Sequence, residues 1–498
     1  MSDKYILTVD AGTKSIRGIV FNHQGEIIAR EIKNLPAITP QPGWVEQDPV
    51  LLFDTVQTVI ADALIGAHIE ADQIEALAIA NQRETTIVWD KTTGQPVYNA
   101  IGWRSTQSKA IVSKLAETAD RQLIRKKTGL RLDPIFSASK IRFILDHVPD
   151  GQQRAEQGEL LFGTVNTWLA WQLSAGEIFS TDYTNASRTL LFNINTLQWD
   201  EELLQLFNIP RQMLPKAVAN DQILGTTSSH QVLSQGIPIA AMIGSQQAAL
   251  FGQTAFDLGM VKATYGTGGF IVMNAGTTPS LSMNNLLTSV GYSFKGVTNY
   301  VLEGGILTAG DAVDWFVDQL HFLDSFQDAE VAAKTATSAD ELYFVPAFNG
   351  LAAPYWDPDV RGAFLGLTRG SSRADLVKAA IQSIAYQTED ILTTMAQDTN
   401  LPLAQIRVDG GASKSDYLLQ FAADITHIPV QRSQSQETTA LGAAFIAGLN
   451  TGYYQDFAQL RQLNTGGKIF TPTTDAQTRS RLIGGWHQAI GAAETFKS

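Results

Sequence analysis

The segment YILTVDAGTKSIRGIVFN, residues 5–22, sets the architecture of the chain. Two runs of β-branched and apolar residues, YILTV and IRGIVF, lie on either side of the tip DAGTKS, and this pattern predicts a β-hairpin. A second segment, MVKATYGTGGFIVMN at residues 260–274, has the same form, with Gly266-Thr267 lying 254 residues after Gly12-Thr13. Since this spacing is about half of the 498 residues, the sequence predicts two similar α/β halves, 1–250 and 251–498.

A third glycine turn lies in IRVDGGASKSDYLLQFAADI, residues 406–425. The pattern predicts a strand that leads into Asp409-Gly410-Gly411 and then an amphipathic helix. Glycines let the backbone approach a ligand closely, and the N-terminus of the following helix favours anionic groups. Two further helices are predicted, at 371–392 with a serine N-cap and at 437–450 with small residues that allow close packing.

Composition excludes several classes of protein. The net charge of −13 disfavours nucleic acid or an anionic membrane as the main partner, although backbone N–H groups still allow phosphate binding. The absence of cysteine excludes disulfides and thiolate chemistry. The N-terminus MSDKYILTVD has too short an apolar run for a signal peptide. Residues 222–256 carry no Asp, Glu, Lys or Arg, but Pro238 and many polar residues interrupt them, so a buried core is predicted. We therefore expect a cytoplasmic protein.

Asp10 ends the first predicted strand, directly before the Gly12-Thr13 turn. A carboxylate there can hold Mg²⁺, while the turn offers N–H groups and a hydroxyl to phosphate oxygens. The alternative is an aspartate that only caps its own turn. The two Gly-Thr tips and the Asp-Gly-Gly turn together favour a phosphate clamp between two domains. No P-loop and no G-x-G-x-x-G after a strand is present.

IGSQQAALFG, residues 243–252, predicts a strand, a tight turn at Gly244 and a helix, an arrangement that aims Ser245 into a cleft. Ser245 is not in a G-x-S-x-G elbow, and no histidine or acid lies within ten residues of it. The sequence therefore disfavours a hydrolase nucleophile.

Long stretches of the chain resemble glycerol kinases of the FGGY carbohydrate-kinase family, from end to end and most closely those of Gram-positive bacteria. The stretches are PGWVEQDP (42–49), NQRETTIVWDKTTGQPVYNAI (81–101), ELLFGTVNTWLAW (159–171), TDYTNASRTLLFNI (181–194), QQAALFGQ (246–253), TYGTGGF (264–270), APYWDP (353–358), RGAFLGLTRG (361–370), VDGGA (408–412) and TTALGAA (438–444). The resemblance implies an actin-like ATPase fold, with two ribonuclease-H-like domains around a cleft that holds ATP and a polyol or sugar. It also implies a role in carbohydrate or glycerol metabolism and a homodimer or tetramer.

The resemblance assigns roles to individual residues. Those expected near ATP and Mg²⁺ are Asp10, Gly12, Thr13, Lys14, Arg17, Gly266, Thr267, Gly268, Gly310, Gly411 and Ala412, with Asp10 facing the metal. Those expected at the polyol are Arg83, Glu84, Trp103, Ile135, Gln246 and Phe270. Without the resemblance, Arg83 and Glu84 are interpreted as an ordinary exposed ion pair.

The chain departs from the family pattern at several of these positions. Ser245 stands where the family has the aspartate that accepts the proton of the attacking hydroxyl, Ile135 replaces a tyrosine, Lys14 replaces a threonine and Asp311 adds a carboxylate. A neutral serine is no base near pH 7, and loss of a positioned base costs about 10²–10⁴-fold in rate. A phosphorylated histidine of Gram-positive relatives aligns with Gln231, so that regulation is not predicted despite the neighbouring His230.

Two hypotheses follow from these departures. The first is a divergent ATP-dependent kinase of a polyol or sugar with weak or absent glycerol activity. The second is a catalytically inactive pseudo-kinase with a ligand-binding or regulatory role.

Overall fold

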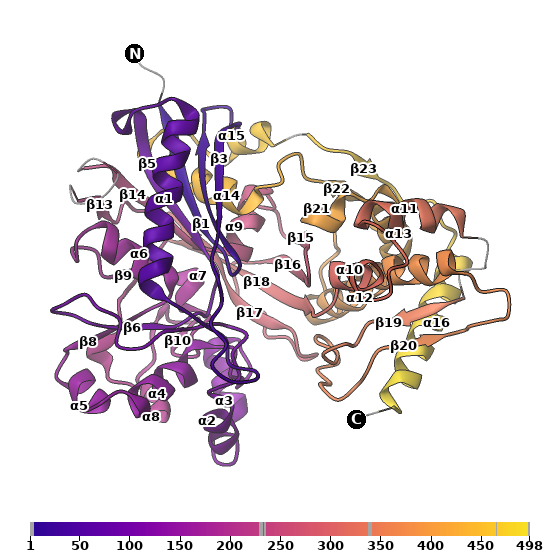
Figure 1. Ribbon diagram of the computed structural model, residues 1–498, viewed down its shortest axis with the longest axis horizontal. Coiled ribbons are helices and arrows are strands. Elements are labelled where there is room, and N and C mark those ends of the chain that lie inside the picture. The colour runs from indigo at the N-terminus through magenta and orange to yellow at the C-terminus, as the bar shows by residue number, and fades with distance from the viewer. Residues whose placement is uncertain (1–3, 229–232, 234–235, 337–340, 465, 497–498) are drawn as a thin grey trace.

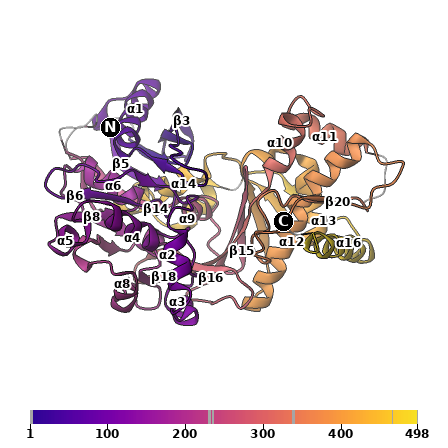
Figure 2. The same cartoon turned by 60° about the horizontal axis from the view of Figure 1, so that its bottom comes forward.

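The structure is a computed structural model that describes residues 4–228, 233, 236–336, 341–464 and 466–496. His230 and Gln231 lie outside the described residues. Two lobes, each built around a mixed β-sheet, stand side by side (Figures 1 and 2). The α/β fold class predicted from the sequence is confirmed.

The N-terminal sheet has six strands in the order β13-β14-β5-β1-β2-β3. These are β1 (Tyr5–Ala11), β2 (Ser15–Phe21), β3 (Ile27–Asn34), β5 (Ile74–Asn81), β13 (Gly225–Thr226) and β14 (Pro238–Gly244). The predicted hairpin at 5–22 is confirmed as the antiparallel pair β1–β2, and β5 runs parallel to both β1 and β14. Both faces of the central strands are covered, which explains why β1, β5 and β14 are nearly continuous apolar runs, whereas the edge strand β3 is mostly exposed. Along β1, Leu7 and Val9 pack with helix α1, whereas Ile6 packs with helix α14.

The C-terminal sheet has seven strands in the order β17-β18-β16-β15-β21-β22-β23. These are β15 (Met260–Tyr265), β16 (Gly269–Gly276), β17 (Leu287–Phe294), β18 (Val297–Ile306), β21 (Gln405–Asp409), β22 (Val430–Arg432) and β23 (Ile469–Phe470). The second predicted hairpin is confirmed as the antiparallel pair β15–β16, and β21 runs parallel to β15. The hairpin β17–β18 also contacts the N-terminal lobe, where the Tyr300 hydroxyl donates to the carbonyl of Ile194 at 2.8 Å.

The helices and the short strands complete the chain. The helices are α1 (Pro49–Ala67), α2 (Lys109–Leu115), α3 (Arg121–Thr128), α4 (Ser137–His147), α5 (Gly151–Glu156), α6 (Val165–Leu173), α7 (Tyr183–Ala186), α8 (Glu201–Phe207), α9 (Ser245–Gly252), α10 (Gly310–Asp318), α11 (Phe326–Thr335), α12 (Arg373–Thr399), α13 (Asp416–Thr426), α14 (Thr438–Thr451), α15 (Phe457–Leu463) and α16 (Ala476–Glu494). The short strands are β4 (Glu46–Gln47), β6 (Ile87–Asp90), β7 (Ala100–Ile101), β8 (Leu160–Gly163), β9 (Ser180–Asp182), β10 (Phe192–Asn193), β11 (Gln198–Trp199), β12 (Lys216–Val218), β19 (Tyr343–Val345) and β20 (Ala363–Leu365).

Helices α9 and α14 join the two halves of the chain. α14 lies late in the sequence but packs on β1, β5 and β14 of the N-terminal sheet, as the yellow helix in Figure 1 shows. A Cβ added at Gly442 of α14 would lie 1.9 Å from the carbonyl oxygen of Ala248, so glycine is required for this approach. The prediction that the small residues of this helix allow close packing is therefore confirmed. The division of the chain near residue 250 falls within α9 and stays a prediction.

The uncharged stretch 222–256 contains β14 and α9, most of whose residues are buried, as predicted. Among the described helices, α1 is long and apolar enough to cross a membrane by length and composition alone. In the fold, its Leu52, Val56 and Val59 are buried against the N-terminal sheet.

Candidate functional site

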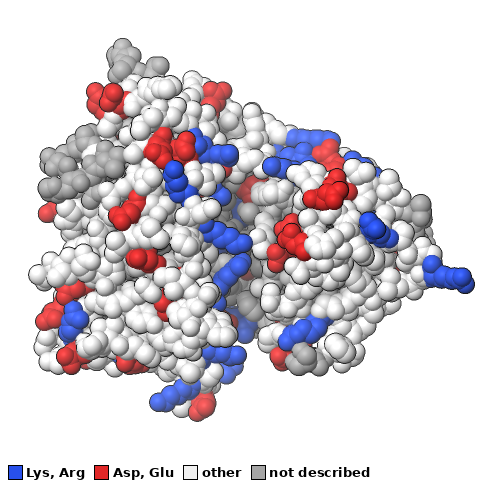
Figure 3. All heavy atoms as spheres, viewed as in Figure 1, with Lys and Arg blue, Asp and Glu red and all other residues white. Residues whose placement is uncertain are grey.

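Three parallel strands of the N-terminal sheet end at one edge. Asn81, the last residue of β5, pairs with Ala11 on one side and with Gly244 on the other. The residues around these ends, Asp10, Arg83, Glu84 and Ser245, therefore gather at one edge. Open α/β sheets bind ligands outside the carboxyl ends of their strands. The space-filling view shows a hollow between the two lobes with Lys and Arg side chains along its rim (Figure 3), even though the net charge of the chain is −13.

Asp10 is a buried carboxylate held by one arginine. Arg17 Nη1 donates to Asp10 Oδ2 at 3.0 Å, and Arg17 Nε lies 3.7 Å from Glu437 Oε2. Burial raises the pKa of Asp10 above its usual range, and the attraction of Arg17 opposes that shift only in part. An anion placed between a single arginine and a second carboxylate is under-compensated, so a cation near Asp10 would stabilise it.

The tip of the first hairpin contacts an aromatic pair. Trp103 Nε1 donates to Thr13 Oγ1 at 2.9 Å, and Gln47 Nε2 donates to the carbonyl of Thr13 at 2.8 Å. The Trp103 ring meets the ring of Phe270 from β16 edge-on, at 6.3 Å between centroids. The structure thus brings together Thr13, Trp103 and Phe270, which lie far apart in the sequence and come from both lobes.

Arg83 and Glu84 belong to a buried cluster of four charges. Arg83 donates to both carboxylate oxygens of Glu303 at 2.6 and 2.9 Å, and Arg188 Nε donates to Glu84 Oε1 at 2.6 Å. Arg83 and Glu84 are 5% and 4% exposed, so the interpretation as an exposed ion pair is wrong. Although burial alone would raise it, Arg188 and Arg83 lower the pKa of Glu303 to about 2.

The backbone of Glu84 is held in an unusual conformation beside this cluster. Its φ of 62° lies in the left-handed region, which costs about 1–3 kcal/mol and persists where the surroundings hold it. Ser137 Oγ and Lys140 Nζ donate to the Glu84 carbonyl at 3.1 and 3.4 Å. Lys140 also donates to the carbonyl of Ile135, and burial lowers the pKa of Lys140 to about 7. Glu84 and Ile135 are therefore linked through one buried lysine.

Ser245 is the first residue of α9, directly after β14, so the predicted strand, turn and helix are confirmed. The Gly244 N–H donates to Thr184 Oγ1 at 2.8 Å, which fixes the turn. Ser245 is half-buried, and within the described residues its hydroxyl has no hydrogen-bond partner. With no base to activate it in that part of the chain, the structure agrees with the sequence in disfavouring a nucleophile.

The second hairpin and the Asp-Gly-Gly turn lie side by side in the C-terminal sheet. Thr264 of β15 pairs with Asp409 of β21, so the turns that follow these strands meet at one edge. Gly410 has φ of 89°, and a Cβ there would lie 2.5 Å from the carbonyl oxygen of Tyr265. Gly411 is exposed beside this contact, whereas Ala412 is buried in the core of the lobe.

Helix α10 begins on the tip of the second hairpin. The N–H of Gly310 donates to the carbonyl of Gly266 at 2.8 Å, and the N–H of Ala309 donates to the carbonyl of Thr267 at 2.9 Å. Gly266, Thr267, Gly268 and Gly310 are therefore neighbours, while the role that the resemblance gives them at the phosphates stays a prediction. Burial and the negative charge of Asp311 raise the pKa of Asp314 on this helix, while the exposed Lys14 of the first hairpin lowers it.

The sequence reasoning missed Arg188, Lys262, Glu303 and Glu437. Glu303 lies in the apolar strand VTNYVLEGGI, and Lys262 lies in MVKATY. A single charged residue inside an apolar strand is the signal that would have pointed to each, because such a residue needs a buried partner. Arg188 and Glu437 carry no comparable signal, since their partners are distant in sequence.

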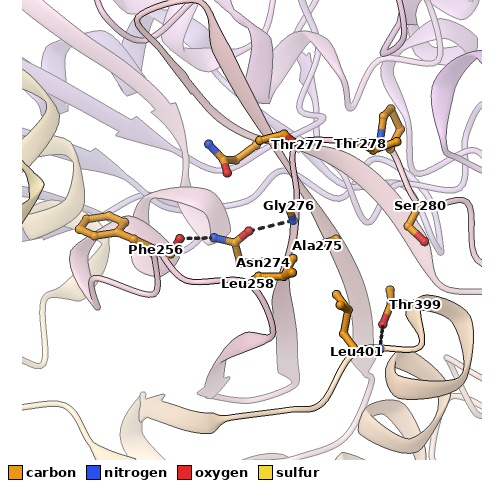
Figure 4. A pocket seen from close by; sticks show the side chains of 12 residues that line it. Phe256, Leu258, Asn274, Ala275, Gly276, Thr277, Thr278, Ser280, Thr399 and Leu401 are labelled. Carbon is orange, nitrogen blue, oxygen red and sulfur yellow. Dashed lines mark hydrogen bonds between the residues drawn. The ribbon is translucent and has the colours of Figure 1, made fainter.

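A separate cavity of about 630 Å³ lies at the C-terminal end of β16, whereas Phe270 lies near the start of that strand (Figure 4). None of the predicted site residues lines it. Asn274 at its wall donates to the carbonyl of Phe256 at 3.0 Å and accepts from the N–H of Gly276 at 3.0 Å, so its amide is occupied by the backbone.

Comparisons with known proteins agree with this architecture. Residues 5–252 match the N-terminal domain and residues 261–451 the C-terminal domain of the FGGY family of carbohydrate kinases. Glycerol kinases of Streptococcus agalactiae and Streptococcus pyogenes are each 50% identical over 494 residues, which is 99% of this chain and 98% of theirs.

Two solved structures show the same fold. Plasmodium falciparum glycerol kinase with ADP superposes with a TM-score of 0.94 at 33% identity, and Lactobacillus acidophilus gluconate kinase with 0.88 at 25% identity. Each comparison covers 99% of this chain and 98% of the other. The predicted actin-like fold of two ribonuclease-H-like domains is confirmed. Both domains match the family models, and half of the residues are identical to those of a glycerol kinase. The chain therefore belongs to the FGGY family of carbohydrate kinases and is a kinase, and hence a transferase.

Proposed function

We propose that this chain is an ATP-dependent phosphotransferase that acts on a hydroxyl of a polyol or sugar, with weak or absent activity on glycerol. The glycerol kinase relatives support the reaction class. The observation that carries the finer proposal is Ser245 at the edge of the N-terminal sheet, next to the Arg83–Glu303 cluster, with no basic group bonded to its hydroxyl in the described residues.

The polyol site consists of Arg83, Glu84, Trp103, Ile135, Gln246 and Phe270. Arg83 and Glu84 supply a donor and an acceptor whose positions are fixed by buried ion pairs, and Trp103 and Phe270 offer ring faces to the C–H groups of a polyol. Ile135 adds an apolar wall, which favours a substrate that presents fewer hydroxyl groups on that side.

The ATP site consists of the two hairpin tips and the third glycine turn. Gly12, Thr13, Lys14 and Arg17 face the phosphates from one lobe, and the residues that face them from the other lobe are Gly266, Thr267, Gly268, Gly310, Gly411 and Ala412. Proteins bind Mg²⁺ through one or two carboxylates together with substrate phosphates. Asp10 fits that role because its buried carboxylate is only partly compensated by Arg17. When bound, Mg²⁺ neutralises charge that develops on the transferred phosphoryl group.

Ser245 limits the rate of proton removal from the attacking hydroxyl. A positioned base contributes about 10²–10⁴-fold in rate, and a serine hydroxyl does not replace it near neutral pH. Phosphoryl transfer passes through a loose transition state in most analyses, so positioning by both lobes still supports turnover. We therefore expect a slow enzyme on its own substrate rather than an inert protein.

An inactive pseudo-kinase with a ligand-binding or regulatory role is the second candidate, and one observation favours it. Asp311 and Asp314 place two carboxylates on the first turns of α10, next to the hairpin tip that would face ATP phosphates. Burial raises the pKa of Asp314, with a further contribution from Asp311. Negative charge at this place weakens the binding of a nucleotide unless Lys14 or Mg²⁺ offsets it.

Three expectations remain proposals. A boundary between the two domains near residue 250 and a cytoplasmic location rest on the sequence pattern, and a homodimer or tetramer rests on the resemblance. The net charge of −13 disfavours nucleic acid or an anionic membrane as the main partner.

The test is phosphoryl transfer from Mg-ATP to glycerol and a panel of polyols and sugars, with wild type and Ser245→Asp compared side by side. Activity of the wild type on some polyol supports the kinase. Activity of Ser245→Asp alone, at least 100-fold above wild type, identifies the missing base as the cause of a silent site. If neither protein turns over any substrate, the pseudo-kinase becomes the better account.

A further inference from the structure

Lys262 is a buried cation that the proposed chemistry does not use. It lies on β15 with 0% exposure, and its ammonium donates to Gln246 Oε1 and to the carbonyl of Phe270, the latter at 3.3 Å. Gln246 and Phe270 are both proposed to contact the substrate, and they come from different elements, α9 and β16. One lysine therefore contacts two parts of the polyol site from behind.

The charges around Lys262 are fixed by the fold. Burial lowers its pKa to about 8; the carboxylates of Asp409 and Glu303 oppose this shift, and Arg83 adds to it. At neutral pH the lysine is mainly an ammonium, which has three donors and no acceptor. A buried ammonium without acceptors is costly, so its hydrogen bonds to Gln246 and Phe270 hold firmly.

The lysine decides which way the Gln246 amide points. An ammonium can only donate, so the amide oxygen of Gln246 must face Lys262. The amide NH₂ group then points away from Lys262. Gln246 is half-buried in the first turn of α9, directly after Ser245, so its NH₂ is the part of the amide left for a ligand.

We propose that Lys262 is a positioning residue that fixes Gln246 as a hydrogen-bond donor to a substrate hydroxyl, so that this hydroxyl binds as an acceptor at Gln246. This inference rests on the proposed function, because it assumes that a polyol occupies the site. It goes beyond that function by stating the polarity of one contact and by naming the buried residue that sets it. A substrate group that can only donate is rejected there, whereas a hydroxyl or a carbonyl is accepted.

Three variants test the inference, each measured by the KM and kcat for the best polyol of the panel and by calorimetric titration of the same polyol. Gln246→Glu keeps the shape and the acceptor towards Lys262 but removes both donors. Because a hydroxyl can turn and donate to a carboxylate, the loss is measured with a carbonyl analogue of the polyol, which only accepts, and its Kd rises about ten-fold, the effect of one neutral hydrogen bond. Lys262→Met frees the amide to turn and raises KM by a similar factor, with kcat changed less than three-fold. When Gln246→Leu is already present, Lys262→Met produces no further rise in KM or Kd.

The outcomes separate this inference from the proposed function. If wild type binds the carbonyl analogue and Gln246→Glu binds it equally well, the amide oxygen or no part of Gln246 faces the ligand and the inference is overturned. The inference is also overturned if Lys262→Met raises KM equally in wild type and in Gln246→Leu, because Lys262 then has a general structural role. If wild type neither binds nor phosphorylates any polyol, the proposed function fails and this inference fails with it. Lys334→Met, at an exposed lysine on α11, is the control, and Gln246→Glu keeps the test open if Lys262→Met does not fold.

Discussion

Removing the carboxylate of Glu303 by Glu303→Gln tests whether the buried charge cluster is balanced as the structure indicates. Glu303 accepts two hydrogen bonds from Arg83 and lies 3.2 Å from Arg188 Nη2, while Glu84 supplies the second negative charge. The substitution keeps the shape of the side chain but leaves two guanidinium groups against one carboxylate. We expect the free energy of unfolding to fall by about 3–5 kcal/mol, the usual cost of breaking a buried ion pair.

The pKa of Glu303 gives an independent magnitude. Its value of about 2, against 4.5 for an ordinary glutamate, corresponds to about 3 kcal/mol of stability at neutral pH. Because the pKa in the folded state is depressed, this contribution is present above about pH 4.5 and is lost as the pH falls towards 2. The difference between wild type and Glu303→Gln therefore shrinks over that range, while the two magnitudes agree near neutral pH.

The assay is urea unfolding followed by tryptophan fluorescence at pH 7, with Glu341→Gln as the matched control. Arg481 and Glu341 also form an ion pair at 2.6 Å, but their side chains are 49% and 66% exposed, so its loss changes the stability by less than about 1 kcal/mol. In the double variant Arg83→Met/Glu303→Gln the loss is smaller than the sum of the two single losses, because neither charge is left alone. If Glu303→Gln costs no more than Glu341→Gln, the reasoning about this cluster is refuted.

Two further predictions concern stability outside the cluster. Burial raises the pKa of Glu389 to about 7 against the attraction of Arg479, so the contribution of Glu389 to stability falls as the pH rises from about 4.5 to 7. The hydrogen bond to Asp390 raises the pKa of His487, so the contribution of His487 also falls as the pH rises. Urea midpoints measured between about pH 4.5 and 7 flatten in Glu389→Gln, and an unchanged slope would contradict the assignment. Gly442→Ala places a Cβ 1.9 Å from a backbone oxygen and lowers the free energy of unfolding by at least about 1–3 kcal/mol. The control is Gly484→Ala on α16, whose added Cβ meets no atom within 4 Å and which raises the free energy of unfolding by about 0.5–1 kcal/mol. Equal effects of the two substitutions in thermal unfolding would exclude close packing of α9 on α14.

The candidate site shows where local pattern stops being informative. Lys14 and Asp314 lie 300 residues apart in the sequence, yet the charge of Lys14 acts on the Asp314 carboxyl because the fold brings the first hairpin tip near α10. The positions of Asp10 and Ser245 at one edge also depend on parallel pairing through β5. No property of either segment alone specifies that register.

The sequence by itself determined the two Gly-Thr hairpins, the buried uncharged stretch and the small-residue helix, because each depends on the periodicity and turn chemistry of neighbouring residues. It also determined the family, since long motifs survive at half identity to relatives. Only the tertiary structure decided that Arg83 donates to both carboxylate oxygens of Glu303 while its Nε lies 3.9 Å from the adjacent Glu84, that α14 crosses to the N-terminal sheet and that Lys262 contacts Gln246. These pairings join residues that are distant along the chain, and a buried charge is stabilised by whichever partner the packed fold brings within hydrogen-bond distance.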